Sequence, residues 1–350
     1  MNKMLKYKII AIVSSLLVAF ASCDDWTGTE SINLIEADIE KDNPELYAQY
    51  LANLRAYRNT DHKVTYVWFD NTKNAPVSRG GEQISAIPDS IDVVNLTNPD
   101  DLSSWVMSDM KSVRENKGMK FVFTISYPDI EKEYEQYLSQ NEEGDESADG
   151  FLAYAADFVD KKLALIDKYG YDGISVLFYG MKTIHLGDEA KEAYLARENA
   201  FMSKISTWVA QKSDKIFIFE GNPQNLTDKS ILQEAEFIVV RTESLKYASG
   251  GLSYEVLLTI EDGVPTDRFL ITVNTKSLDA TDLKTGYYYN SENELVSCIP
   301  LAAEWIDTYE SKFKKAGLGI LNVQNDYYNS GNSYMNIRNS ISTMNPSPKE

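Results

Sequence analysis

Histidine and cysteine are scarce in this chain of 350 residues, which contains two of each. They are too few for a Cys/His zinc site, and their surroundings suggest no Ser-His-Asp arrangement. Basic residues are also in short supply, with 34 Lys and Arg against 53 Asp and Glu, so the net charge is −19. Because a negative surface repels phosphate backbones, we expect no nucleic-acid partner. We also expect no metal and no cofactor, and any chemistry would depend on carboxylates, amides, hydroxyls and aromatic rings.

Long hydrophobic runs are absent except at the N-terminus, where residues 1–22 have the features of a secretory signal. Lysines precede the apolar run Ile9 to Phe20, which is shorter than the roughly 20 residues that span a bilayer. Phe20-Ala21-Ser22-Cys23 resembles a bacterial lipobox, in which the cysteine is lipidated, and Asp24-Asp25 resembles the export tag of Bacteroides-type surface lipoproteins. The alternative is an ordinary cleaved signal followed by an incidental cysteine.

These features predict three parts: a lipoprotein signal over residues 1–22, a tether over 23–43 lipidated at Cys23, and one folded domain over 44–350. The mature protein would be anchored by lipid to the outer membrane, at the cell surface. Cys298 would then be the only unmodified thiol, so no intramolecular disulfide is expected. We expect it to be buried in a helix that starts near Pro300. The acidic stretch 140–150 is expected to be a solvated loop.

Composition is otherwise globular, with 43% hydrophobic residues, and short β-branched or aromatic runs alternate with helical patterns. Eight such runs predict a (β/α)₈ (TIM) barrel, an α/β fold, as a single domain. An open doubly wound sheet is the alternative, but no glycine-rich phosphate loop follows the first run. The eight predicted strands are Val64–Phe69, Asp92–Leu96, Lys120–Ser126, Gly173–Phe178, Lys215–Glu220, Phe237–Arg241, Phe269–Asn274 and Gly319–Gln324.

Helices are predicted most clearly where a cap or a continuous apolar stripe occurs. Asn43-Pro44 suits a helix start, with Leu46, Tyr50, Leu54 and Tyr57 on one face. Amphipathic stripes predict two longer helices, over Phe151–Lys168 and Ala190–Lys212. Loops are expected after several strands, where a barrel carries its functional site, and these are Asn71–Ser90, Tyr127–Gly150 and Tyr179–Glu189.

The most informative motif runs from Tyr169 to Tyr179, where a helix ends at glycine and Asp172-Gly173 begins an alternating strand. It resembles the fourth strand of glycoside hydrolase family 18, the chitinases and endo-β-N-acetylglucosaminidases, with the signature Asp-Gly-x-Asp-x-Asp-x-Glu. The resemblance implies a TIM barrel acting on N-acetylglucosamine-containing glycans. In that family the final glutamate protonates the leaving oxygen, and the preceding aspartate orients the substrate's acetamido group, which is the nucleophile.

The departures from this signature matter more than the match. Asp172 and Gly173 match the signature, but its last three acidic positions fall on Ser175, Leu177 and Tyr179. A phenol with an ordinary pKa near 10 is a poor acid at neutral pH, and leucine cannot orient an amide. Other landmarks are also changed: Ser126-Tyr127-Pro128-Asp129 replaces Ser-x-Gly-Gly, Arg241-Thr242-Glu243 replaces a Tyr-Asp pair, and Val323 stands near the sugar-stacking tryptophan. The motif therefore predicts no catalytic residue.

Other carboxylates at predicted strand ends could supply an acid. Glu220 is the best candidate, and Glu243 is the second, although an ion pair with Arg241 is the simpler role for Glu243. Asp172 could equally serve turn structure. Aromatic rings and amides at the same barrel end suit sugar stacking and hydrogen bonding. The predicted ligand-binding residues are Trp68, Asp70, Tyr127, Tyr179, Glu220, Asn222, Arg241, Asn274 and Gln324.

Three functions remain open. The first is a surface lipoprotein that holds N-acetylglucosamine-containing glycans, such as N-glycans, for partner glycosidases and an outer-membrane importer. The second is an active endo-β-N-acetylglucosaminidase that uses Glu220 or Glu243 as its acid. The third is a scaffold that pairs with another surface lipoprotein and binds no sugar.

Overall fold

The computed structural model describes residues 39–72, 80–141, 147–248, 250–290, 292–329 and 331–346. Contacts between residues divide the chain into two units, and the boundary along the sequence falls between Gln49 and Tyr50. In the first unit, the described part contains α2 (Ile39–Asp42) and the start of α3 (Pro44–Tyr57). Asn43 Oδ1 accepts a hydrogen bond from Leu46 N at 3.1 Å, as expected for a helix cap. The predicted signal and the lipidation site Cys23 lie outside the described residues.

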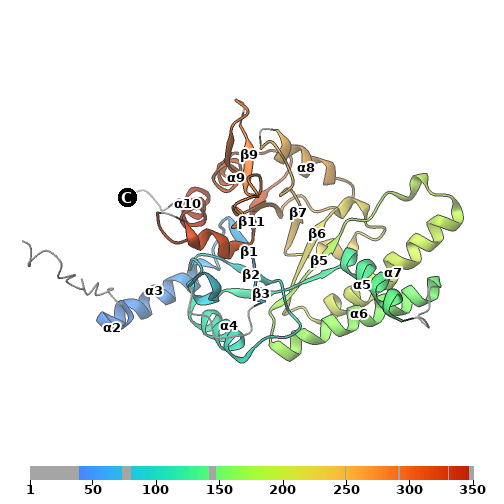
Figure 1. Cartoon of the computed structure of the whole chain (residues 1–350), viewed down its shortest axis with the longest axis horizontal. Helices are drawn as coiled ribbons and strands as arrows, with labels where there is room; N and C mark the ends of the chain where they lie inside the picture. The colour runs from blue at the N-terminus through green and yellow to red at the C-terminus, as the bar shows by residue number, and fades with distance from the viewer. Residues whose placement is uncertain are drawn as a thin grey trace, which may run out of the picture. The chain divides into compact units, whose positions relative to one another are not determined.

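The second unit is a nearly closed barrel of nine parallel strands in the order β3-β2-β1-β11-β8-β7-β6-β5-β4 (Figure 1). Only Phe123 separates β3 from β4, so these two short strands correspond to the single predicted strand Lys120–Ser126. The predicted (β/α)₈ barrel is therefore confirmed. Its strands are β1 (Val64–Phe69), β2 (Val93–Leu96), β3 (Lys120–Val122), β4 (Thr124–Ser126), β5 (Gly173–Phe178), β6 (Ile216–Gly221), β7 (Phe237–Val240), β8 (Phe269–Asn274) and β11 (Lys315–Leu321).

The last barrel strand begins and ends earlier than predicted. It spans Lys315–Leu321, whereas the sequence pattern placed it over residues 319–324. Gly317 weakened the strand signal in its first half. Glycine is required there because a Cβ would lie 2.0 Å from the Val64 carbonyl oxygen of β1. Asn322 then adopts a left-handed conformation with φ 55°, which ends the strand.

Helices surround the barrel, as Figure 1 shows. Most core residues lie between the sheet and these helices, and a smaller apolar cluster fills the barrel interior. The α-helices of this layer are α4 (Ser104–Lys117), α5 (Tyr127–Gln140), α6 (Ala148–Tyr169), α7 (Asp188–Gln211), α8 (Gly251–Thr259), α9 (Cys298–Asp307) and α10 (Met335–Met344). Short 3₁₀ turns are η1 (Gly80–Glu82), η2 (Ile84–Ala86), η3 (Thr183–His185), η4 (Pro223–Asn225), η5 (Ser230–Gln233) and η6 (Val323–Tyr328).

Helix α5 corrects the prediction that residues 127–150 form a loop. Ser126 Oγ accepts a hydrogen bond from Asp129 N at 3.3 Å, and Pro128 occupies the first turn. This capped start, with Ile130 buried against the core, stabilises a helix that the acidic composition concealed. Of the acidic stretch 140–150, residues 142–146 lie outside the described part.

The prediction for Cys298 is confirmed, and the prediction for α3 holds only in part. Cys298 is buried at the start of α9, as expected, and burial raises the pKa of its thiol to about 12. The expected apolar face of α3 is buried at Leu54 but exposed at Leu46 and Tyr50, and the buried side includes Leu51 instead. Among the described residues, no helix combines the length and apolarity needed to cross a bilayer.

Candidate functional site at the carboxyl ends of the barrel strands

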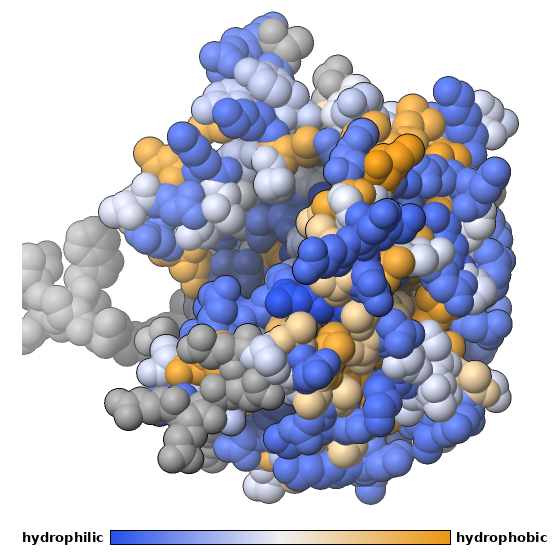
Figure 2. Space-filling model, turned by 90° about the vertical axis from the view of Figure 1, so that its right-hand side faces the viewer, coloured by the Kyte–Doolittle hydropathy of each residue, from blue (hydrophilic) through white to orange (hydrophobic). Residues whose placement is uncertain are grey.

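The carboxyl ends of the strands surround a polar recess. Figure 2 looks onto the side of the molecule at which α7 begins, and the hollow there is lined mainly by hydrophilic residues. A depression of about 360 Å³ lies over the ends of β1, β2 and β4, next to Asn98, Ser126 and Asp129. It shares Asn71 and Thr72 with a second depression of about 170 Å³. The two depressions therefore adjoin, and together with their neighbours they are called the groove.

This groove continues towards β8. The second depression shares Leu278, Asn325 and Tyr328 with a third one of about 540 Å³, formed by the segment after β8 and by η6. Amide side chains recur along all three depressions, and Tyr328 is about half exposed. An elongated groove with amides and an aromatic ring suits a chain of sugar units.

The positions that carry the family signature lie on β5. Ser175 is fully buried and faces the barrel interior, and Leu177 is half-buried beside Glu220 of β6. Tyr179 follows the end of β5 and is 38% exposed. Burial, together with the nearby Glu243 and Glu220 carboxylates, raises the pKa of the Tyr179 phenol, although Arg241 opposes this effect. This strand end therefore presents a phenol that is an even weaker acid than free tyrosine.

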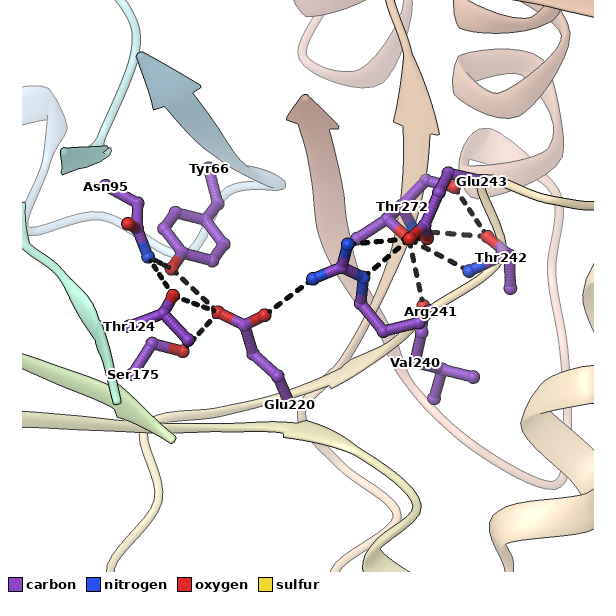
Figure 3. Close-up of polar contacts among 10 residues, drawn as sticks. All are labelled: Tyr66, Asn95, Thr124, Ser175, Glu220, Val240, Arg241, Thr242, Glu243 and Thr272. Atoms are coloured by element: carbon purple, nitrogen blue, oxygen red, sulfur yellow. Dashed lines mark hydrogen bonds and ion pairs between the residues drawn. The ribbon is translucent and has the colours of Figure 1, made fainter. Parts of the chain in front are cut away.

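Glu220 lies at the centre of the barrel interior (Figure 3), where it is fully buried. Its Oε1 accepts hydrogen bonds from three hydroxyl groups: Ser175 Oγ at 2.5 Å, and Tyr66 Oη and Thr124 Oγ1 at 3.2 Å each. Burial, followed by the Glu220 charge, raises the pKa of Tyr66 well above its usual value, so this phenol remains a donor. The carboxylate is thus buried in the barrel interior with three hydroxyl donors on one of its oxygens.

The second oxygen of Glu220 binds the guanidinium of Arg241, with Oε2 and Nη1 2.9 Å apart. Arg241 also pairs with Glu243 at 2.6 Å, and Glu243 Oε2 accepts a hydrogen bond from Thr272 Oγ1 at 2.5 Å. Burial favours the neutral form of each group. In Arg241 the attraction of both carboxylates outweighs this effect and raises its pKa, and in Glu243 the bonds from Arg241 and Thr272 lower its pKa.

The predicted ion pair between Arg241 and Glu243 is therefore confirmed, and Glu220 is its third member. One cation between two carboxylates leaves a net charge of −1 in this cluster. Trp68 covers it from β1, with its ring centroid 5.6 Å from the Arg241 guanidinium carbon. Because the Trp68 ring is buried in the barrel interior, its visible role is to pack against Arg241 rather than to stack on a sugar.

The remaining predicted ligand-binding residues are spread around the recess. Asp70 is exposed, and its backbone N donates a hydrogen bond to Gln324 Oε1 at 3.3 Å. Asn274 Oδ1 accepts one from Asn322 Nδ2 at 3.3 Å. Asn222 follows β6, where its backbone N bonds the Phe178 carbonyl at 3.0 Å. The structure thus brings Asp70 and Gln324 together in the groove, whereas Asn222 lies on the other side of the barrel mouth, near the end of β5.

Tyr127 and Asp172 have structural positions. The Tyr127 ring starts α5 and makes edge contacts with Phe178 and Phe201 at centroid distances of 5.4 and 5.3 Å. The expectation that it faces the recess is wrong, because the capped helix turns this ring into the helix layer. Asp172 lies at the amino end of β5 and accepts hydrogen bonds from Phe121 N at 2.8 Å and Arg114 Nε at 2.9 Å.

Sequence reasoning missed the hydroxyl groups that donate to Glu220 and the Asn95 amide that donates to two of them. Asn95 Nδ2 donates to Tyr66 Oη at 2.5 Å and to Thr124 Oγ1 at 2.8 Å, which extends the network to β2. Each residue points inward because strand side chains alternate, and this alternation was the available signal. Among the described residues, no group of three or more His, Cys, Asp or Glu side chains is placed to hold a metal.

Comparisons with known proteins identify the family of the chain and agree with its barrel fold. A family model described as "Glycoside hydrolase family 18, BT1044-like" matches residues 27–343. A selenomethionine form of BT1044 with a glutamate replaced by glutamine has a TM-score of 0.62 at 18% identity, over 90% of this chain and 98% of that chain. An endo-β-N-acetylglucosaminidase from Cordyceps militaris has a TM-score of 0.56 at 16% identity, over 85% and 96% of the two chains. A search of curated proteins finds no match.

A third solved structure has the same fold at greater sequence distance. It is YKL-39 in the presence of chitooligosaccharides (GlcNAc4), with a TM-score of 0.52 and 9% identity, over 81% of this chain and 100% of that chain. At such low identities, all three similarities concern the fold alone.

Proposed function

We propose that this chain, which belongs to the BT1044-like group of glycoside hydrolase family 18, binds N-acetylglucosamine-containing glycans and does not cleave them by the family's mechanism. The observation that carries this proposal is the chemistry at the end of β5. Tyr179 occupies the position of the proton donor, and the environment raises the pKa of this phenol. A glycosidic oxygen needs an acid that can give up a proton near neutral pH.

The two candidate replacement acids are poorly suited to this task. Glu220 is fully buried, and each of its oxygens already accepts hydrogen bonds or an ion pair. Glu243 is held as an anion, because Arg241 and Thr272 lower its pKa, whereas a general acid needs a raised one. The nucleophilic step lacks support as well, because Leu177 has no polar group to orient an acetamido nitrogen. These features favour binding over hydrolysis.

The groove supports the binding part of the proposal. Its three depressions present amides and the half-exposed ring of Tyr328 over the ends of β1, β2, β8 and β11. Its structural neighbours include an endo-β-N-acetylglucosaminidase and YKL-39 in the presence of chitooligosaccharides, which fits a ligand built from N-acetylglucosamine. With a lipobox-like segment at Cys23, we further propose that the barrel is anchored by lipid at the outer surface of the cell. There it would hold N-glycans for partner glycosidases and an importer.

Two measurements on the purified protein test this function. Mass spectrometry of a glycoprotein and of its released N-glycans, after incubation with the protein, should show no cleavage. Calorimetry with the same glycans should show binding, and Tyr328→Ala should weaken it roughly tenfold, as for an aromatic contact worth more than 1 kcal/mol. Tyr309→Ala is the matched control, because Tyr309 is 90% exposed at the opposite end of the barrel.

Each alternative function has its own outcome in these measurements. Release of free oligosaccharide at an enzymatic rate would establish an active endo-β-N-acetylglucosaminidase, and Glu220→Gln and Glu243→Gln would then identify its acid. Absence of binding to any N-glycan or chitooligosaccharide would leave the scaffold function. Binding without cleavage, weakened by Tyr328→Ala and unchanged by Tyr309→Ala, is the outcome that the groove predicts.

A further inference from the structure

A small hairpin in the connection between β8 and α9 exposes aromatic rings beside the recess. It consists of β9 (Tyr287–Tyr289) and β10 (Leu295–Ser297), which pair antiparallel. Because side chains alternate along a strand, the buried ring of Tyr288 anchors the hairpin, while Tyr287 and Tyr289 share the opposite face. The Tyr288 phenol lies next to Thr242, which directly follows Arg241 of the buried ion-pair cluster. The hairpin therefore rests on the rim of the barrel mouth.

A second segment adds another ring to this face. Tyr247, from the loop after β7, forms a parallel bridge with Tyr289, and Tyr289 N donates a hydrogen bond to the Lys246 carbonyl at 2.8 Å. The rings of Tyr247 and Tyr289 lie 5.7 Å apart between centroids at an angle of 40°, and Tyr247 is 50% exposed. Backbone pairing thus fixes two tilted rings at the surface.

Hydrogen bonds also link described residues on the two sides of the hairpin. Asn290 Oδ1 accepts hydrogen bonds from the backbone N of Glu292 at 3.0 Å and of Glu294 at 2.8 Å. Asn293 has a left-handed φ of 63°, and its Oδ1 accepts a long hydrogen bond from Tyr247 Oη at 3.5 Å. The rings are consequently preformed with polar groups beside them. Preformed amphipathic surfaces of this kind bind ligands at a low cost in conformational entropy.

We propose that Tyr247 and Tyr289 form a second glycan-binding platform, which stacks against a pyranose ring of an oligosaccharide that also occupies the barrel mouth. This inference rests on the proposed function and narrows its ligand to glycans long enough to reach both sites. Continuity with the mouth favours a sugar as the occupant. Tyr247 lies four residues after Glu243, so at most ~14 Å of extended chain separates them. Flat apolar rings bordered by amides match the C–H faces and hydroxyl edges of a pyranose.

The test compares a long and a short ligand on the full-length protein. Affinities for a released complex N-glycan and for N,N′-diacetylchitobiose are measured by calorimetry for the wild type, Tyr247→Ala and Tyr289→Ala. Each variant should bind the long glycan about tenfold more weakly and the disaccharide as the wild type does. Tyr309→Ala is again the control and should bind both ligands like the wild type. Thermal unfolding verifies that each variant is folded.

A second variant addresses the case in which removal of a ring disturbs the loop. Tyr247→Leu retains apolar volume but offers no flat face, whereas Tyr247→Trp keeps one, so only the leucine variant should lose affinity for the long glycan. Equal affinity of all variants for the long glycan would overturn the platform while leaving the function intact. A wild type that binds neither ligand would overturn the proposed function and the platform together. Parallel losses for both ligands would also contradict a separate second site.

Discussion

The hydroxyl of Ser175, on β5, donates a hydrogen bond of 2.5 Å to the buried carboxylate of Glu220, on the neighbouring β6. Ser175 stands at the second aspartate position of the family signature, three residues after Asp172. The barrel interior thus still contains a carboxylate at this level, but a different strand supplies it. Since Arg241 and three hydroxyl groups bind this carboxylate on both oxygens, we infer that it serves the structure of the interior.

Removal of the Glu220 charge should destabilise the fold. Glu220→Gln leaves a buried arginine with only Glu243 as partner, and loss of one member of a buried pair typically costs about 3–5 kcal/mol. Because Glu243 remains, we expect a loss of at least ~2 kcal/mol in the free energy of unfolding, measured by urea denaturation. The control is Glu261→Gln, which breaks an exposed pair with Lys182 and should cost less than ~1 kcal/mol. Similar losses in both variants would contradict a structural role for Glu220.

Restoring the second signature aspartate should be unfavourable in this chain. Ser175→Asp places a second carboxylate against Glu220 in a fully buried position, where two adjacent carboxylates resist ionisation together. The double variant Ser175→Asp/Glu220→Gln removes this conflict. Denaturation of the four proteins should therefore give a favourable coupling energy of about 1–3 kcal/mol. Additive effects would show that the two positions do not share one charge site.

Restoring the proton donor alone should not restore hydrolysis. Tyr179→Glu supplies an acid at the end of β5, but Leu177 still cannot orient an acetamido group. We expect no free oligosaccharide from Tyr179→Glu by mass spectrometry, and any gain to require Leu177→Asp as well. Tyr179→Gln is the matched control for changes in binding. Turnover by Tyr179→Glu alone would show that the acetamido-orienting position is dispensable.

His62 should make the stability of the barrel depend on pH. Its Nδ1 lies 2.8 Å from the Thr60 carbonyl and its Nε2 lies 3.0 Å from Asp92 Oδ1, so both partners only accept hydrogen bonds. The ring satisfies both as an imidazolium, and the hydrogen bond to Asp92 raises the pKa of His62 despite burial. Because the pKa of His62 is higher in the folded than in the unfolded protein, its protonation stabilises the fold fully below the unfolded pKa of about 6.5. This contribution is lost as the pH rises through the pKa of the folded protein.

The measurement is the difference in unfolding free energy between the wild type and His62→Gln from pH 5 to pH 9. This difference should be largest at the acidic end and should shrink as the pH increases. His185→Gln is the control, because His185 is an exposed histidine of η3 and should leave the pH profile unchanged. A difference that stays constant over the whole range would show that His62 does not titrate against Asp92.

The sequence by itself determined the barrel and the chemical deficit at the end of β5. Strand signals such as Val64–Phe69 and Gly173–Phe178 depend on local composition, and the identities of Leu177 and Tyr179 fix what they can do as acids or ligands. Glycine obscured the first half of β11, and a helix cap at Ser126 turned an expected loop into α5, because both effects depend on partners distant in sequence.

Only the tertiary structure decided the role of Glu220. Its sequence position at a strand end fits a solvent-facing acid as well as a buried ion. Closure of the barrel brings Tyr66, Thr124, Ser175 and Arg241 from four other strands or strand ends around it, and these residues bury it and occupy both of its oxygens. The rings of Tyr247 and Tyr289 were likewise paired only by folding. Hydrogen bonding and desolvation act between residues that are neighbours in space, and the order of residues along the chain does not specify those neighbours.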